Sequence, residues 1–254
     1  MRLPLSYRMR AALLGLTGAL LVAAAGVWLV PYLMHRYDHH GLRHVTVATG
    51  LETPWAIAFL PDQRMLVTER LGRIRIVQRD GRVGPPLAGV PPVFARFEGG
   101  LMDVALDPNF SANQRIYWSY SEPSAANDGR AGTAVARGRL GAEGLTDVTV
   151  IFREPVKEND GRHYGSRLLF APDGRLFVSL GDRAARGDAQ KLGSTHGKIL
   201  RLESDGSAPA DNPFASTPGA PAHGLVAGPP QRARPGVSTW HRRALGQRTW
   251  AAGR

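Results

Sequence analysis

The residues best suited to chemistry lie in one segment, Gly161–Arg183, which reads GRHYGSRLLFAPDGRLFVSLGDR. A single histidine, His163, occupies a glycine-flanked loop directly before two apolar runs joined by Pro172-Asp173-Gly174. Pro presets φ, Asp caps locally and Gly accepts a positive φ, so this sequence predicts a strand–turn–strand unit. Imidazoles titrate near neutral pH, and one at the mouth of such a hairpin is well placed to transfer a proton. Taken alone, it could equally be an ordinary surface histidine.

The elements that position this loop recur along the chain. Ala56–Thr68, Val104–Ser119 and Leu168–Ser179 each contain an apolar run, a Pro-Asp or Asp-Pro turn, a basic residue and a second run rich in β-branched or aromatic residues. Self-similarity at a spacing of roughly 40–60 residues predicts a repeat architecture, for which four-stranded propeller blades are the natural all-β candidate. After residue 45 no segment has a helical period, so an all-β domain is expected. Further strands are expected at Arg73–Gln78, Thr133–Leu140, Thr149–Phe152 and Lys198–Leu202.

Five segments also carry a family resemblance. They are LETPWAIAFLPDQRMLVTERLGRIRIV (Leu51–Val77), GGLMDVALDPNF (Gly99–Phe110), GTAVARGRL (Gly132–Leu140), HYGSRLLFAPDGRLFVSLGDR (His163–Arg183) and HGKILRLESDGSAPADNPF (His196–Phe214). In this order they resemble the soluble-type sugar dehydrogenases that depend on pyrroloquinoline quinone (PQQ), also called glucose/sorbosone dehydrogenases. The resemblance implies a six-bladed β-propeller with PQQ and calcium in a central cleft. We therefore expect residues 46–217 to form part of such a propeller.

The same resemblance implies roles for individual residues. The family histidine that takes the sugar hydroxyl proton, while hydride passes to the quinone, falls on His163. Glu98 stands where the family commonly has a glutamine at the substrate cleft, and Arg183 is a second candidate cleft residue. Arg162, directly before the histidine, replaces the small or acidic residue expected there.

From Pro218 onward the chain departs from the family pattern. After Asp211 the charged residues are all arginines, which contribute six of the formal charges in a net +11. A solvated basic tail or an arginine-rich segment for nucleic acid or membrane surfaces would have this composition. A third interpretation is favoured. Gly224–Arg232 and Arg248–Arg254 can be translated back into codons whose third bases are free to choose. When these codons are read one base later, the first segment becomes V-W-S-L-G-H-R-N and the second becomes E-H-G-P-R-G-G, which are two family motifs in the family order.

We therefore predict that residues 218–254 are an out-of-frame, disordered basic tail of a truncated chain, with no nucleic-acid partner. In the family, the G-H-R-N motif contacts PQQ, and E-H-G-P supplies calcium ligands. Because these family positions are lost after Pro218, the cofactor-binding residues are unknown here and no metal ligand is assigned. PQQ-dependent activity is not expected of this chain.

The amino-terminal segment predicts a membrane partner. Three arginines in residues 1–10 precede an uncharged apolar run at 11–33, long enough to span a bilayer and oriented with its amino end in the cytoplasm. We expect an uncleaved signal anchor at 11–33, a juxtamembrane linker at 34–45 and a periplasmic soluble domain on the inner membrane. Cleavage after Ala23-Ala24-Ala25 is the alternative.

The predicted function is oxidation of an aldose, a small-molecule sugar, with hydride transfer to PQQ. Because no protein side chain accepts hydride, such a reaction requires a cofactor. Two alternatives remain open: a non-catalytic propeller-type binding module and a calcium-dependent sugar lactonase. The absence of cysteine allows but does not require an oxidising compartment.

Overall fold

The computed structural model describes residue 29, residues 44–142 and residues 144–227, and divides the chain into two compact units, Met1–Thr46 and Val47–Arg254. In the first unit only Leu29, which is helical, and residues 44–46 are described. The predicted anchor at 11–33 therefore lies almost entirely outside the described residues. Among those described, no helix is long and apolar enough to span a membrane.

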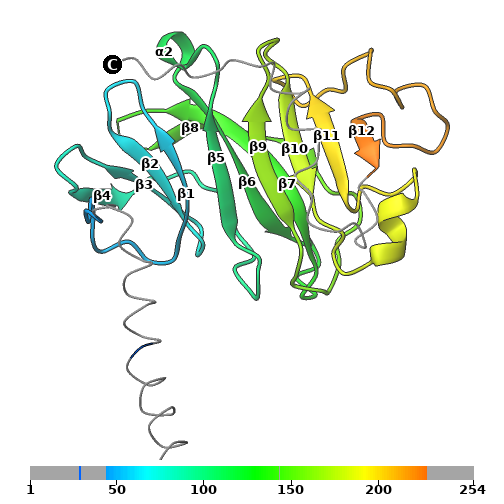
Figure 1. The fold of residues 1–254 in the computed structure, drawn as a ribbon, viewed down its shortest axis with the longest axis horizontal. Helices are drawn as coiled ribbons and strands as arrows, with labels where there is room; N and C mark the ends of the chain where they lie inside the picture. The colour runs from blue at the N-terminus through cyan, green and yellow to red at the C-terminus, as the bar shows by residue number, and fades with distance from the viewer. Residues whose placement is uncertain (1–28, 30–43, 143, 228–254) are drawn as a thin grey trace, which may run out of the picture. The chain divides into compact units, whose positions relative to one another are not determined.

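The second unit consists of three four-stranded antiparallel sheets in which each strand pairs with the next in sequence (Figure 1). This strand order is that of β-propeller blades, and the all-β expectation is confirmed. Besides the strands, the unit has a one-turn helix α2 (Phe110–Asn113) and a 3-10 turn η1 (Arg186–Gln190). The strands are β1 (Pro54–Phe59), β2 (Met65–Glu69), β3 (Arg73–Val77), β4 (Val83–Pro86), β5 (Leu101–Leu106), β6 (Arg115–Pro123), β7 (Ala131–Leu140), β8 (Leu145–Arg153), β9 (Gly165–Phe170), β10 (Leu176–Leu180), β11 (Lys198–Leu202) and β12 (Gly224–Ala227).

The third sheet corrects the boundary predicted at Pro218. Strand β12 comes from the segment expected to be a disordered tail, yet it pairs with β11, with Lys198 opposite Ala227 and Ile199 opposite Val226. An antiparallel ladder is made by backbone N–H and C=O groups, so it does not depend on the family sequence being present. The end of the propeller part at 217 was therefore placed too early, and the disorder prediction is wrong for 224–227. Residues 228–254 lie outside the described residues.

The predicted Pro-Asp hairpins form at the turns after β1 and β9. Asp62 Oδ1 accepts the N–H of Arg64 at 3.1 Å, and Asp173 Oδ1 accepts the N–H of Arg175 at 3.1 Å. In both turns the other carboxylate oxygen binds the guanidinium of the same arginine, at 2.8 and 2.9 Å. These bonds join residues two positions apart, so the turns are specified locally.

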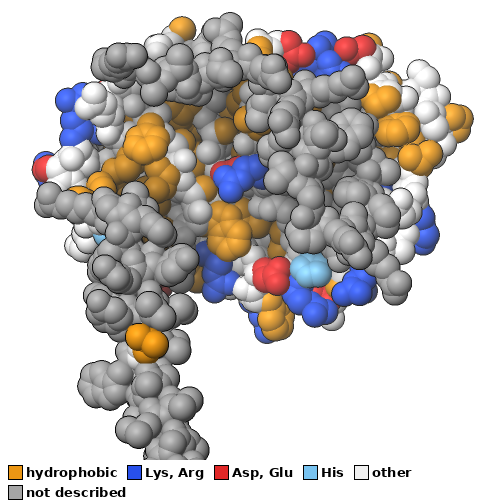
Figure 2. Space-filling view, viewed as in Figure 1, with side chains coloured by type: hydrophobic (Ala, Val, Ile, Leu, Met, Phe, Trp, Pro, Cys, Tyr) orange, Lys and Arg blue, Asp and Glu red, His pale blue; other side chains and the backbone are white. Residues whose placement is uncertain are grey.

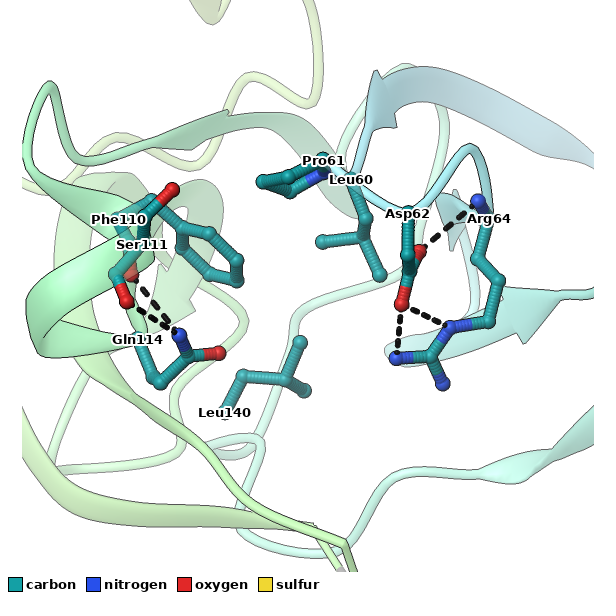
Figure 3. A pocket seen from close by; sticks show the side chains of 8 residues that line it. All are labelled: Leu60, Pro61, Asp62, Arg64, Phe110, Ser111, Gln114 and Leu140. Atoms are coloured by element: carbon teal, nitrogen blue, oxygen red, sulfur yellow. Dashed lines mark hydrogen bonds and ion pairs between the residues drawn. The ribbon is translucent and has the colours of Figure 1, made fainter.

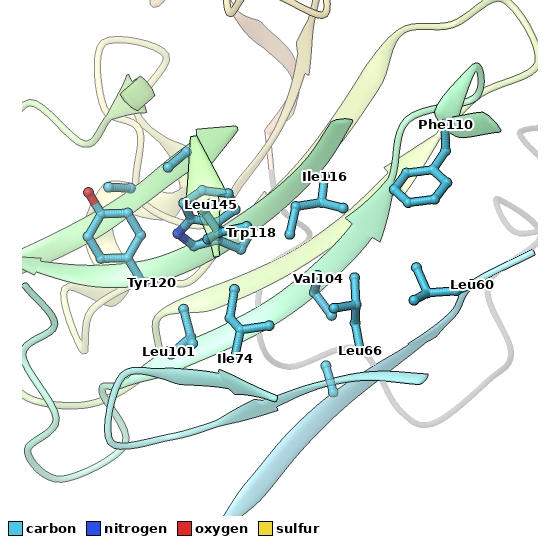
Figure 4. Close-up of a cluster of buried hydrophobic side chains, with 13 residues drawn as sticks. Leu60, Leu66, Ile74, Leu101, Val104, Phe110, Ile116, Trp118, Tyr120 and Leu145 are labelled. Carbon is cyan, nitrogen blue, oxygen red and sulfur yellow. The ribbon is translucent and has the colours of Figure 1, made fainter. Parts of the chain in front are cut away.

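The core lies between the sheets, and the second sheet is covered on both faces. Along β6, Ile116 and Trp118 pack toward the first sheet, whereas Tyr117 belongs to the cluster shared with the third sheet. This alternation follows from the two-residue period of a strand. Figure 4 shows Trp118 and Ile116 facing Leu66 and Ile74 across the first interface. Burying such side chains stabilises the fold by about 1.5–3 kcal/mol each.

The first and third sheets each have one uncovered face. On β1, Ala56 is buried while Trp55, Ile57 and Phe59, on the opposite face, are exposed. Figure 2 shows hydrophobic side chains at the surface over the left of the view, where β1 lies in Figure 1. Leu169 and Ile199 are exposed on the third sheet. Apolar strand residues of this kind normally pack against a further sheet.

Buried polar side chains lock the register between neighbouring sheets. The Thr68 hydroxyl donates to the Met102 carbonyl at 2.6 Å, joining the first sheet to the second. Asp103 Oδ2 accepts the N–H of Leu168 at 2.7 Å, and the Ser119 hydroxyl donates to the Ser166 carbonyl at 2.7 Å, joining the second to the third. These contacts hold β5 beside β9 and so bring together the loops that precede them.

Candidate active site

His163 lies in the loop before β9 and is held by two carboxylates from distant segments. Its backbone N–H donates to Glu98 Oε2 at 2.7 Å, and its ring Nδ1 lies 2.7 Å from Asp182 Oδ1. The side chain of His163 is 39% exposed, whereas that of Asp182 is only 4% exposed. One side of the imidazole is therefore anchored to a buried carboxylate while the rest of the ring reaches solvent.

Asp182 sets which ring nitrogen of His163 carries the proton. A carboxylate 2.7 Å from Nδ1 accepts a hydrogen bond from Nδ1–H, which leaves Nε2 as the unprotonated nitrogen. Asp182 Oδ1 also accepts the N–H of Ala184 at 3.1 Å, which fixes the carboxylate. A base oriented by a third group in this way is the arrangement of general-base sites.

Sequence reasoning assigned Asp182 no role, because it follows His163 by nineteen residues. The signal that could have found it is Gly181. A Cβ at Gly181 would collide with the His163 carbonyl, so a glycine there lets the chain pass directly beneath the histidine loop. The Gly-Asp pair directly after β10 places the carboxylate of Asp182 within hydrogen-bonding distance of His163 Nδ1.

Glu98 lies beside His163. Its N–H donates to the Gly161 carbonyl at 3.0 Å, and its Oε2 accepts the His163 N–H, so two hydrogen bonds join the 96–99 and 161–163 loops. Glu98 is exposed, and its second carboxylate oxygen is available to a ligand's hydroxyl group. Its substrate role stays a prediction.

Arg183, the other predicted cleft residue, is buried beneath the loop. It is 2% exposed, and its guanidinium carbon lies 3.4 Å from the centroid of the Tyr164 ring. One terminal nitrogen donates to the carbonyls of Ala131 at 3.2 Å and Asp160 at 2.5 Å. These contacts correct the expected position: Arg183 supports the 160–164 loop from below and does not line an open cleft.

Arg162, the residue that departs from the family pattern, is turned toward Asp160. Its Nη2 lies 2.8 Å from Asp160 Oδ2, and the hydrogen bond from this guanidinium lowers the pKa of Asp160 to about 2. Arg162 is exposed and lies one residue before His163. The guanidinium of Arg162 is thus paired within its own loop.

A buried polar cluster lies behind the histidine loop and was not anticipated. Glu154 Oε2 accepts the N–H of Thr133 at 2.9 Å, and its Oε1 lies 3.7 Å from Nε2 of the buried His196. Burial raises the pKa of Glu154 to about 7, against the opposing effects of the Thr133 N–H and Arg183. Gly197, next to His196, donates to the Gly181 carbonyl at 2.9 Å, which places this cluster close to Asp182.

Two pockets lie away from His163. The first, about 270 Å³, lies among the turns that follow β1 and β5, where Asp62 and Arg64 satisfy each other (Figure 3). Its lining residues are Leu60, Pro61, Asp62, Arg64, Phe110, Ser111, Gln114 and Leu140. The second, about 800 Å³, is bounded by residues 155–158, 188–196 and 219–221 and includes His196. Among the described residues, no group of three or more His, Cys, Asp or Glu side chains could hold a metal ion.

Comparison with known proteins places this geometry in a family. The sequence profile described as glucose/sorbosone dehydrogenase matches residues 51–225, and so continues a short way beyond Pro218. The chain belongs to the glucose/sorbosone dehydrogenase family. The aldose sugar dehydrogenase YliI of Escherichia coli is 46% identical over 175 residues, which cover 68% of this chain and 47% of that protein.

Solved structures show the same relationship. The apo-form soluble aldose sugar dehydrogenase of Escherichia coli is 43% identical with a TM-score of 0.68, covering 71% of this chain and 52% of that one. The PQQ-bound aldose sugar dehydrogenase of Streptomyces coelicolor is 33% identical with a TM-score of 0.61, covering 70% and 51%. The family is thus one of PQQ-dependent sugar dehydrogenases. The chain spans about half the length of these relatives.

Proposed function

We propose that this chain carries the proton-accepting part of an aldose dehydrogenase site centred on His163. The observation that supports this most directly is the contact between His163 Nδ1 and the buried Asp182. This contact leaves Nε2 unprotonated and on the other side of the ring from Asp182. Oxidation of an aldose at its anomeric carbon removes one hydroxyl proton and one hydride, and leaves a lactone carbonyl. His163 Nε2 takes the proton, and Asp182 stabilises the imidazolium that results.

The chain's own side chains cannot take the hydride, and PQQ supplies that acceptor when bound. Among the described residues, the two arginines beside His163 are not free to bind the carboxylates of this cofactor. PQQ carries carboxylates that call for arginine forks, yet Arg162 is paired with Asp160 and Arg183 is stacked on Tyr164. The described residues contain no cluster of side chains that could bind calcium. The proton transfer proposed here uses only His163 and Asp182.

For this reason we expect no PQQ-dependent oxidation of glucose by the 254-residue chain, with or without calcium. The missing contacts are expected in the frame-restored protein, which should encode G-H-R-N and E-H-G-P-R-G-G after a one-base slip between about Asn212 and Gly224, the interval that contains Pro218. Sequencing the gene across this interval tests the proposal. A shifted frame that lacks these motifs or is interrupted by stop codons would refute it.

His163→Ala in the frame-restored protein tests the catalytic assignment. Turnover of aldose with PQQ and an electron-accepting dye should fall by about a hundredfold or more, the usual contribution of a positioned base. PQQ affinity, measured from its absorbance, should change little. Turnover that is unaffected by the substitution removes His163 from the mechanism.

The alternatives are separated by the same assay. A calcium-dependent sugar lactonase would hydrolyse a sugar lactone without reducing the dye, and a binding module would bind sugar with no turnover. The exposed His163 beside a buried carboxylate favours the dehydrogenase, since a binding module needs no oriented base.

We also propose that residues 11–33 anchor the protein in the inner membrane, with the propeller part in the periplasm. The support is the uncharged run and the arginines before it. A reporter that is active only outside the cytoplasm, fused after Leu202, should give signal in the membrane fraction. An uncleaved product in the cytoplasm contradicts this topology.

A further inference from the structure

The loop before β5 contains a strained aromatic residue. Gly99 N–H donates to the Arg96 carbonyl at 2.8 Å, which closes a four-residue turn with Phe97 and Glu98 at its centre. Phe97 has a φ of +52°, and Glu98 is not among the residues with positive φ. A positive φ at only the first central position is the pattern of a type II′ turn, where glycine is the favoured residue. A bulky side chain there is a genuine outlier.

The surrounding contacts impose this conformation on Phe97. Arg70 Nη1 donates to the Phe97 carbonyl, and the next residue, Glu98, donates its N–H to the Gly161 carbonyl at 3.0 Å. A Cβ on Gly161 would lie 2.7 Å from Cβ and Cγ of Phe97, so only glycine fits beneath it. These contacts fix the backbone of Phe97 and place its side chain against Gly161, in the loop that carries His163.

Core packing does not account for a phenylalanine at this position. Phe97 is 71% exposed and belongs to none of the buried hydrophobic clusters. A glycine would relieve the backbone and cost no core packing. Strained residues that packing does not require are concentrated at ligand-binding sites, and this one is joined to His163 through Glu98.

We propose that Phe97 is a specificity-determining residue, an aromatic platform on which a pyranose ring lies while its anomeric hydroxyl reaches His163. This inference rests on the proposed function. The ring hydrogens of a pyranose form an apolar face that packs on an aromatic ring, while its hydroxyl groups need acceptors. Glu98, adjacent to Phe97 and exposed, offers a carboxylate oxygen to those hydroxyls. Pyranoses whose ring hydrogens form an uninterrupted face should bind best.

Sugar binding to the full 254-residue chain, followed by saturation-transfer NMR with glucose, tests the proposal without requiring turnover. Phe97→Gly should weaken binding about tenfold, the size expected for a lost aromatic contact, while the thermal midpoint stays level or rises because the turn is relaxed. Phe97→Trp should retain binding. Phe59→Gly is the matched control, because Phe59 is 70% exposed on β1 and remote from the His163 loop; its glucose affinity should not change.

The possible results separate the two ideas. Equal glucose binding by Phe97→Gly and the unchanged chain overturns the platform and leaves the proposed function standing. A drop in glucose binding that Phe59→Gly reproduces, or that comes with a lower thermal midpoint in Phe97→Gly, also overturns it, because it reports a structural role. No glucose binding by the unchanged chain overturns both the substrate class and the platform.

Discussion

At the turns after β1 and β9, each aspartate accepts a hydrogen bond from the residue two positions further on. In the loop before β9, by contrast, His163 is held by the carboxylates of Glu98 and Asp182, which are 65 and 19 residues away in the sequence. We call the first region (residues 60–64 and 171–175) the hairpin end and the second (residues 96–100 and 160–164) the site end. Figure 1 shows α2, which lines the first pocket together with residues of the hairpin end, at the top of the view, and the loop that leads into β9 at the bottom. The hairpin end is stabilised by local bonds, whereas the site end depends on the packing of two sheets.

The difference extends to buried ionisable side chains. Non-glycine residues with positive φ occur at both ends, Gln63 at the hairpin end and Phe97 and His163 at the site end. The ionisable side chains of Glu154, Arg183 and His196, by contrast, are buried close to the site end. At the hairpin end the ionised side chains are partly exposed and paired. Burying ionisable side chains costs stability, and such side chains with shifted pKa values are concentrated at functional sites. Substitutions should therefore alter activity and pH dependence at the site end and only stability at the hairpin end.

The largest expected effect is that of Asp182→Asn. An asparagine amide that donates to Nδ1 leaves the proton on Nε2, so the base of His163 is lost although its position is kept. Turnover in the frame-restored protein should fall by about a hundredfold or more. In the 254-residue chain, nitrogen NMR of the His163 ring should report the change of tautomer. An unchanged tautomer and rate would remove Asp182 from the site, whereas Asp62→Asn, the hairpin-end control, should leave both unaffected.

Glu154→Gln should change how stability depends on pH. Burial raises the pKa of Glu154 to about 7, above the ordinary glutamate value of 4.5. Between these values the unfolded chain releases the proton while the folded chain keeps it, so the free energy of unfolding falls as pH rises through this window. The full difference is on the order of 3 kcal/mol.

The glutamine variant should lose this slope and be the more stable protein at pH 8, as measured by urea unfolding between pH 4 and 8. Glu203→Gln is the control, because Glu203 pairs with Arg175 at the hairpin end and its side chain is 42% exposed. It should keep the slope. Identical pH profiles for Glu154→Gln and the unchanged chain would show that Glu154 is ionised in the folded state.

Local and non-local contacts also explain what could be predicted from the sequence. The Pro-Asp-Gly hairpin and the strands around it were predictable, because the turn is determined by residues within three positions. The family resemblance assigned separate roles to His163 and Glu98, and their hydrogen bond was not predicted. The burial of Arg183 and the cluster of Glu154 with His196 could not be predicted, because they depend on how the second and third sheets pack.

The carboxyl-terminal boundary shows the limit of the resemblance. Pro218 was taken as its end because the family motifs stop there in the sequence as written, yet β12 (Gly224–Ala227) completes the third sheet beyond it. Strand β11 offers a row of backbone donors and acceptors, and an edge of this kind pairs with a following segment whatever its side chains. The family motifs therefore did not mark the end of the sheet.

Two glycines extend the comparison to the backbone. A Cβ at Gly161 would lie 2.7 Å from Phe97 Cβ, whereas a Cβ at Gly174 meets nothing within 4 Å but requires a φ of +83°. Gly161→Ala must displace the Phe97 turn and should lower the free energy of unfolding by about 1–3 kcal/mol. Gly174→Ala should cost about 1 kcal/mol from the backbone alone. Urea unfolding measures both, and only Gly161→Ala should also weaken sugar binding; equal effects on binding would contradict the division into two ends.

The smallest effect is expected from Asp173→Ala at the hairpin end. The substitution removes the bond from Arg175 N–H to Oδ1 at 3.1 Å and the contact of Oδ2 with the Arg175 guanidinium at 2.9 Å. The side chain of Asp173 is 48% exposed, so water replaces these partners and the ion pair contributes little. Arg175 also keeps Glu203, whose Oε1 lies 3.1 Å from its Nε. The thermal midpoint should fall slightly, with a loss of about 0.5–1 kcal/mol for the turn bond, and sugar binding should be unchanged. If Asp173→Ala reduced sugar binding as strongly as Phe97→Gly, the hairpin end would be coupled to the site through β9, and the separation between the two ends would not hold.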